Sequence, residues 1–259
     1  MGRKAIDKTG EEKLNNFGSK MIVKEYRKAI DIDVYFPEYN WIVEHARYDH
    51  FKNGNIKCPY EPRICEVGYL GEGKYKVKED GKHTNEYRIY YEMLRRCYDS
   101  KFQEKHPSYK GCTAENDWFN FQNMAEWIDK NYYKIPGEKM HLDKDILCKG
   151  NKVYSRNTCI FVPQRINELF TKNDKTRGYS PIGVTPTSSG NYQVRCDGVN
   201  GERIYLGSYS TKEEAFQVYK EYKERVIKEV IDSYEGKIPE PFYSRLKTAM
   251  YNYKVEMDD

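Results

Sequence analysis

The chain has 259 residues, of which 38% are hydrophobic and 32% are charged. This low hydrophobic share favours several small modules over one large core, and no run approaches the roughly 18 apolar residues of a membrane helix. The net charge of +4 does not by itself establish a nucleic-acid partner. The seven cysteines lack C-x-x-C spacing, so we expect reduced thiols in a cytosolic protein without a secretory signal, rather than a zinc site.

The N-terminal quarter of the chain is expected to hold a tail and a small β module. Residues 1–18 are polar and rich in glycine and asparagine, which predicts a flexible tail. Residues 19–65 contain short β-prone runs that are interrupted by turn-forming residues such as Pro37. These runs predict a small SH3-like β-barrel that carries no catalytic residues.

The next block, residues 66–171, is expected to be mainly helical at its start. A segment rich in glycine and lysine at 66–83, expected to be a hairpin or a linker, precedes apolar residues at helical spacing over 87–97. A second amphipathic helix begins near Asn120. We interpret both helices as an aromatic support for the segment that follows them.

The most informative stretch lies at residues 142–170. A short apolar segment ends in two acids, Asp143 and Asp145, and a Gly-Asn turn leads into a second strand-like run that reaches residue 159. Pro163 then stands where the first residue of a helix is expected. Such a strand–turn–strand–helix unit can hold one divalent cation between a strand and the helix. The simpler alternative is that the two acids cap backbone amides or pair with neighbouring lysines.

Residues 178–235 follow a polar linker and predict a three-stranded sheet backed by a helix. Apolar and polar side chains alternate along the three strands, which predicts one packed face and one polar face. Thr211 and Glu214 form a capping box that begins the helix. Residues 236–259 predict a last helix. The candidate binding residues on the polar face and in the linker are Gln193, Arg195, Arg203, Tyr205 and Arg177.

The C-terminal module resembles a known DNA-binding family. The runs GNYQVRC (190–196) and GERIYLGSYSTKEEAFQVY (201–219) are similar to the ethylene-response-factor (Apetala)-type domain, over about 50 residues. In that family a three-stranded sheet lies in the major groove of DNA and a helix backs it. The resemblance implies double-stranded DNA as the partner, and arginines on an open sheet face suit base and phosphate contacts.

A second resemblance covers residues 86–170. The pieces YYEMLRRCY (90–98), NDWFNF (116–121), LDKD (142–145) and YSRNTC (154–159) are similar in order and spacing to phage HNH-type homing endonucleases. These enzymes hold one divalent metal in a ββα unit, use a histidine to activate water and hydrolyse DNA phosphodiesters. The resemblance implies a phage-encoded protein that acts in the cytoplasm of a bacterial host.

Carried over residue by residue, the resemblance assigns roles to the ββα unit. Asp143 takes the position of the acid that binds the metal, Asn157 that of the asparagine that braces the loop, and Asn167 that of the metal ligand on the helix. The metal is expected to be Mg²⁺ or another divalent ion. Lys144 stands where the general-base histidine is expected, and an ordinary lysine does not take a proton from water at neutral pH. Asp145 and His141 are the alternative bases.

The sequence therefore predicts an α+β protein made of a small β-barrel module, a helical block with an HNH-like ββα-metal unit, and a three-stranded sheet packed on a helix. The first functional hypothesis is a metal-dependent DNA endonuclease of the HNH homing type. The alternative is a catalytically degenerate phage protein that binds DNA or blocks a host defence, with a host protein as a further partner. An RNA-binding protein is a weaker third hypothesis, which rests on the 25 tyrosines.

Overall fold

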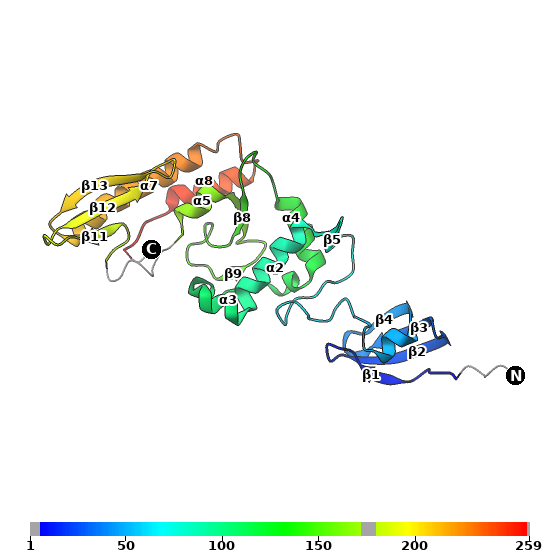
Figure 1. The fold of residues 1–259 in the computed structure, drawn as a ribbon. Coiled ribbons are helices and arrows are strands. Elements are labelled where there is room, and N and C mark those ends of the chain that lie inside the picture. Colours follow the sequence, from blue (N-terminus) through cyan, green and yellow to red (C-terminus); the bar gives the residue numbers. More distant parts are fainter. Residues whose placement is uncertain (1–5, 172–179, 258–259) are drawn as a thin grey trace. The chain divides into compact units, whose positions relative to one another are not determined.

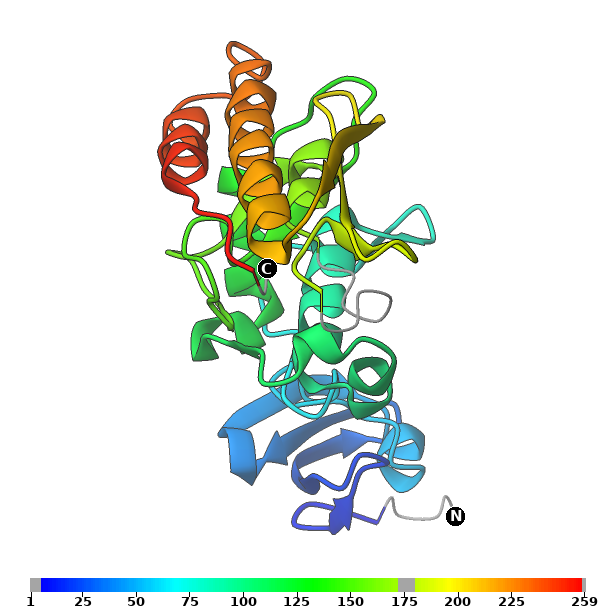
Figure 2. The same ribbon diagram turned by 90° about the vertical axis from the view of Figure 1, so that its left-hand side faces the viewer.

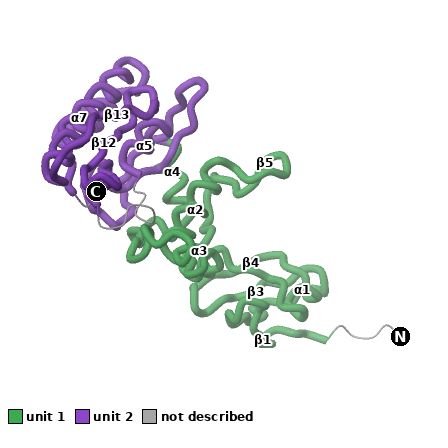
Figure 3. Tube along the Cα trace, turned by 60° about the vertical axis from the view of Figure 1, so that its left-hand side comes forward, with its two compact units in different colours: residues 1–129 green, residues 130–259 purple. Residues whose placement is uncertain are grey.

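The computed structural model describes residues 6–171 and 180–257, and the chain divides into two compact units, residues 1–129 and 130–259 (Figure 3). The boundary between them falls inside the range 66–171 that the sequence analysis treats as one domain. Both units combine helices with small sheets (Figure 1), so the predicted α+β class is confirmed. None of the described helices is long and apolar enough to span a membrane.

Unit 1 begins with an antiparallel sheet in the order β1-β2-β3-β4. Its elements are β1 (Glu12–Leu14), β2 (Lys20–Lys28), β3 (Asp31–Phe36), a 3-10 turn η1 (Pro37–Tyr39), β4 (Trp41–Ala46) and the short helix α1 (Tyr48–Lys52). Alternate residues of β2 and β3, among them Val23 and Val34, are fully buried and pack against Phe51 of α1. Period-two alternation thus builds a core on one face of this sheet.

Two predictions for this region are wrong. The described strands form an open sheet with edges at β1 and β4, so there is no closed SH3-like barrel. The predicted flexible tail also ends earlier than residue 18, because residues 12–14 pair with β2 and the Asn15 side chain is buried. Asn15 Oδ1 accepts hydrogen bonds from the amides of Phe17 and Ser19, both at 2.9 Å. This side chain holds the turn between β1 and β2.

The rest of unit 1 is a helical block whose core is aromatic. Its elements are β5 (Lys78–Glu79), β6 (Lys82–His83), α2 (Asn85–Tyr98), α3 (Ser100–Lys105), η2 (Pro107–Tyr109), β7 (Thr113–Ala114), η3 (Asn116–Phe119) and α4 (Phe121–Asn131). The rings of Tyr90 and Phe121 lie 5.4 Å apart, and Trp118 is fully buried. Gly68 packs closely against α2, because a Cβ atom added at this position would lie 2.2 Å from Leu94 Cδ1. Both predicted helices are confirmed as α2 and α4, and within 66–83 a short hairpin forms only at its end, from β5 and β6.

Unit 2 contains two small sheets and two long helices. Its elements are β8 (Met140–Asp143), β9 (Val153–Tyr154), β10 (Ile160–Pro163), α5 (Gln164–Leu169), β11 (Val184–Pro186), β12 (Tyr192–Asp197), β13 (Arg203–Tyr209), α7 (Lys212–Asp232) and α8 (Phe242–Asn252). Figures 1 and 2 both show α7 lying along the sheet β11-β12-β13 and α8 lying beside α7. The Thr211 side chain accepts the Glu214 amide at 3.2 Å, which confirms the predicted N-cap of α7.

Candidate functional site

Unit 2 contains an antiparallel strand pair followed by a short helix where the ββα unit was expected, but the second strand lies later in the sequence than predicted. β8 pairs with β10 in antiparallel register, with Asp143 opposite Ile160, and the short helix α5 packs against both strands. The second strand was expected to reach residue 159, whereas β10 covers Ile160–Pro163. Pro163 therefore ends a strand and precedes α5, instead of being the first residue of the helix. All four residues of β10 are buried, which accounts for the stability of the hairpin.

Asp143 ends β8 and shapes the turn that follows. Its Oδ1 atom accepts hydrogen bonds from the backbone amides of Asp145 at 2.8 Å and Ile146 at 2.7 Å. Burial, and then the charge of Asp145, raise the pKa of the Asp143 carboxyl to about 6, although the two amide bonds act in the opposite direction. Both bonds fall on Oδ1, so Oδ2 is the atom that can face a ligand. Asp143 therefore caps backbone amides, as the simpler interpretation predicted, but these two bonds use only one of its two carboxylate oxygens.

Lys144 does not point into solvent as a base would. Its side chain is buried, and Nζ lies 3.1 Å from Asp145 Oδ2 and 5.8 Å from the centre of the Tyr154 ring. The ammonium group is thus held as the charge partner of Asp145, whose own side chain remains 43% exposed. This arrangement assigns Lys144 an electrostatic role beside Asp143 rather than a proton-accepting one.

His141 and Asn167 lie on the two elements that flank this carboxylate pair. His141 precedes Asp143 by two residues on β8, so the two side chains share one strand direction, and His141 Nε2 is buried from solvent. Asn167 is half-buried on α5. Asp143 and Asn167 therefore belong to elements that pack together, and their role as two ligands of one metal stays a prediction.

The loop between the strands is braced by a residue that the sequence analysis did not select. Asn151 Nδ2 donates to the carbonyl oxygens of Lys144 and Val153, both at 2.7 Å, and Asn151 Oδ1 accepts the Val153 amide at 3.2 Å. Asn157, the predicted brace, has an exposed side chain, and only its carbonyl oxygen accepts a bond, from Arg245 Nη2 at 3.3 Å. The Gly150-Asn151 turn was the available sequence signal, because asparagine commonly bonds its own backbone in turns.

The sheet β11-β12-β13 has the predicted two-sided character. Val194 and Cys196 are buried on the face that α7 covers. On the other face, Arg195 and Tyr205 are exposed cross-strand partners, with Tyr205 55% exposed. A β-bulge between Val194 and Arg195 shifts the register at this point, and bulges commonly re-aim side chains for binding.

The other residues predicted to contact DNA differ in their exposure and in their charge partners. Gln193 is half-buried opposite Ser208. Arg203 is exposed, but its Nη1 forms an ion pair with Asp197 Oδ1 at 2.9 Å, so this arginine is partly neutralised. Arg177 lies outside the described residues.

A direct link joins the ββα unit to the turn of the three-stranded sheet. Arg165 of α5 donates from Nε to the Val199 carbonyl at 2.9 Å and from Nη2 to the Gly198 carbonyl. Close to this link, burial lowers the pKa of Lys223 on α7. The sequence analysis missed Arg165, because no local pattern shows that a helix residue will bind a turn more than 30 positions away.

The residues present allow a hydrated Mg²⁺ but not a metal held by protein alone. Within the described residues, no group of three His, Cys, Asp or Glu side chains could hold a metal ion. Mg²⁺ is usually bound through one or two carboxylates, with water and substrate phosphates as the other ligands. Asp143 Oδ2 and the amide of Asn167 suit such a partial set. Comparison of the chain with family models, curated proteins and solved structures gave no match.

Proposed function

We propose that this chain is a metal-dependent DNA endonuclease of the HNH type, in which unit 2 both binds duplex DNA and hydrolyses one of its phosphodiester bonds. The observation that carries the proposal is Asp143. Its half-buried carboxylate ends the first strand of a hairpin packed on a helix, and burial, followed by the charge of Asp145, raises its pKa to about 6. Such a pair of close carboxylates is costly unless a cation joins it.

Asp143 and Asn167 would hold the metal from β8 and α5. A bound Mg²⁺ supplies an activated water and stabilises the charge that develops on the phosphate. The amide bonds to Asp143 Oδ1 fix the direction of Oδ2, which pre-organises the ligand before DNA arrives. Asn151 holds the loop that carries Lys144, so the charges beside the ligand keep their positions.

Asp145 is the base that the geometry favours. Its carboxylate is 43% exposed and can reach a water molecule from solvent, whereas His141 Nε2 is buried and Lys144 is committed to an ion pair. In this assignment Lys144 keeps the Asp145 carboxylate oriented, because its ammonium lies 3.1 Å away. Asp145 would accept the proton that the attacking water loses.

The open face of the C-terminal sheet would position the duplex. Arg195 and Tyr205 offer a charged donor and an aromatic group from neighbouring strands, in a geometry suited to a groove or to phosphates. Arg165 ties the turn of this sheet to α5, so bound DNA would be held in register with Asp143. The proposed setting is the cytoplasm of a bacterial host, with a phage as the source of the gene.

The test is nicking of a supercoiled plasmid in Mg²⁺ or Mn²⁺ by the full chain, with EDTA as a metal-free control. Asp143→Asn is expected to abolish nicking, and Glu235→Gln, which alters an exposed acid elsewhere in unit 2, is expected to retain it. Nicking that persists in Asp143→Asn, or that resists EDTA, would rule out the proposed centre.

The second candidate is a DNA-binding protein without nuclease activity. The ion pair between Lys144 and Asp145 favours it, because a buried cation beside Asp143 weakens the demand for a metal. Such a protein would regulate phage genes or block a host defence protein. It predicts salt-sensitive binding of duplex DNA that is unchanged by Mg²⁺, with no nicking under any of the conditions above.

A further inference from the structure

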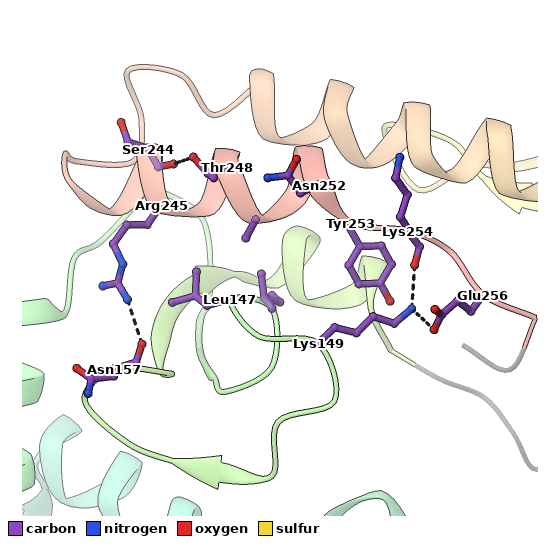
Figure 4. Close-up of a pocket in the computed structure, with 12 residues that line it drawn as sticks. Leu147, Lys149, Asn157, Ser244, Arg245, Thr248, Asn252, Tyr253, Lys254 and Glu256 are labelled. Carbon is purple, nitrogen blue, oxygen red and sulfur yellow. Dashed lines mark hydrogen bonds and ion pairs between the residues drawn. The ribbon is translucent and has the colours of Figure 1, made fainter.

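An open groove lies beside the loop that follows Asp143. It has a volume of about 820 Å³ and runs between α8 and the segment 146–157, with the chain after α8 closing one end (Figure 4). Its size is near the upper end of the about 300–1,000 Å³ typical of ligand sites, but it is not enclosed. An open groove of this kind suits an extended polymer that passes through it better than a small molecule that must be enclosed.

The α8 side of the groove carries a stripe of hydrogen-bonding side chains. Ser244, Thr248 and Asn252 follow one another at intervals of four residues, so they line one side of the helix, and all three are exposed. The opposite side of α8 is apolar, with Leu246 and Met250 buried. Hydroxyl and amide groups of this kind are common donors to phosphate and sugar oxygens.

The charge of the groove is positive. Three basic residues (Lys149, Arg245, Lys254) and one carboxylate (Glu256) line it. Lys149 pairs with Glu256, and the Lys254 ammonium lies 3.7 Å from Glu224 Oε2, so Arg245 supplies the net positive charge. Lys149 is held in place, because its Nζ lies 2.8 Å from Glu256 Oε2 and 2.8 Å from the Lys254 carbonyl. Arg245 is exposed and makes a single 3.3 Å bond to the Asn157 carbonyl, so its guanidinium can turn toward a ligand (Figure 4).

The groove is continuous with the proposed nuclease centre. Ile146, whose amide binds Asp143 Oδ1, lines the groove, and so do Leu147 and Asn157 from the same loop. We propose that this groove binds the sugar–phosphate backbone of duplex DNA on one side of the bond that is cut. Arg245 contacts a phosphate, and Ser244 and Asn252 donate hydrogen bonds to neighbouring oxygens of the DNA backbone. The Thr248 hydroxyl between them already donates to the Ser244 carbonyl at 2.9 Å. This inference rests on the proposed function, because it takes DNA to be the ligand of unit 2.

Three variants with the same net charge test the groove. Ser244→Asp adds a negative charge inside it, in the first turn of α8, where the helix dipole favours an acid and folding is not threatened. Arg245→Ala removes a positive charge from the groove. Arg225→Ala removes one from the exposed surface of α7, where Arg225 pairs with Glu229, and it is the matched control. The probe is a short fluorescein-labelled duplex of random sequence, and binding is measured by anisotropy over a series of salt concentrations.

We expect Ser244→Asp and Arg245→Ala to weaken binding about tenfold and to lower the slope of log K against log salt by about one, while Arg225→Ala changes affinity less than about twofold. Equal behaviour of all three variants would overturn the groove assignment, since only net charge would then matter. Arg195→Ala separates the two proposals. If the unmodified chain nicks DNA and binds the duplex, and Arg195→Ala weakens that binding while the groove variants do not, the proposed function stands and the groove fails. If the unmodified chain does not bind duplex DNA, both fail.

Discussion

Replacement of Asp143 by asparagine should stabilise the metal-free protein at neutral pH. Asparagine keeps an acceptor oxygen for the amides of Asp145 and Ile146, but it removes the buried negative charge. A rise in the carboxyl pKa from 3.8 to about 6 corresponds to a cost of about 3 kcal/mol for the ionised form in the folded state, as an upper limit. A stability loss of this kind is typical of functional sites.

The pH dependence gives this prediction its sign. Below about pH 4 the Asp143 carboxyl is protonated in both folded and unfolded chains, so the two proteins should be equally stable. Between about pH 4 and pH 6 the unfolded chain releases its proton first, and the stability of the unmodified protein falls relative to that of Asp143→Asn. Above about pH 6 the difference in unfolding free energy between Asp143→Asn and the unmodified protein should stay constant at about 1–3 kcal/mol.

Hydrogen exchange at the amides of β8 and β10 is the suitable measurement. All three tryptophans lie in unit 1, so their fluorescence would not report on unit 2. Added Mg²⁺ should protect these amides in the unmodified chain and not in Asp143→Asn. If the β8 and β10 amides of Asp143→Asn exchange as fast as those of the unmodified chain, or faster, at about pH 7, Lys144 already compensates the Asp143 carboxylate. The argument that this carboxylate binds a cation is then refuted.

Three other substitutions test the surroundings of the site. Asn151→Ala removes three hydrogen bonds and should lower the stability of the 144–153 loop by about 1–3 kcal/mol. The loss should be seen as faster hydrogen exchange of the Asp145 and Ile146 amides. Unchanged exchange would show that Asn151 does not hold the loop. Arg165→Ala should leave plasmid nicking intact but spread the cut over several positions on an end-labelled duplex; a single sharp cut would show that the link is not needed for register. Arg195→Ala should weaken duplex binding about tenfold by anisotropy, with the same substitution at the exposed Arg225 as a control of equal charge.

Local patterns in the sequence predicted most elements of unit 2. The alternation around Val194 placed the packed face of the sheet, and Thr211 located the start of α7. Asp143 was placed correctly at the end of the first strand. These features depend on neighbouring residues alone, which is why they could be predicted from one sequence.

Features that depend on distant residues were missed. Pro163 looked like the start of a helix, but the pairing of β10 with β8 extends the strand up to it. The N-terminal strands have the spacing of a barrel, yet no described contact joins β1 to β4, so the sheet stays open. The burial of Lys144 against Asp145 and the link from Arg165 to the turn after β12 are likewise set by tertiary packing.

The most direct test of the account combines a footprint and a cut on the same DNA. An end-labelled duplex that the protein nicks would be probed with hydroxyl radicals in the absence of metal and then incubated with Mg²⁺. The account predicts one nick at a fixed offset from the protected stretch, and an Asp143→Asn variant that gives the same footprint without the nick. A nick made by Asp143→Asn, or a footprint without any nick from the unmodified chain, would contradict the claim that unit 2 both binds DNA and cuts it at a fixed position.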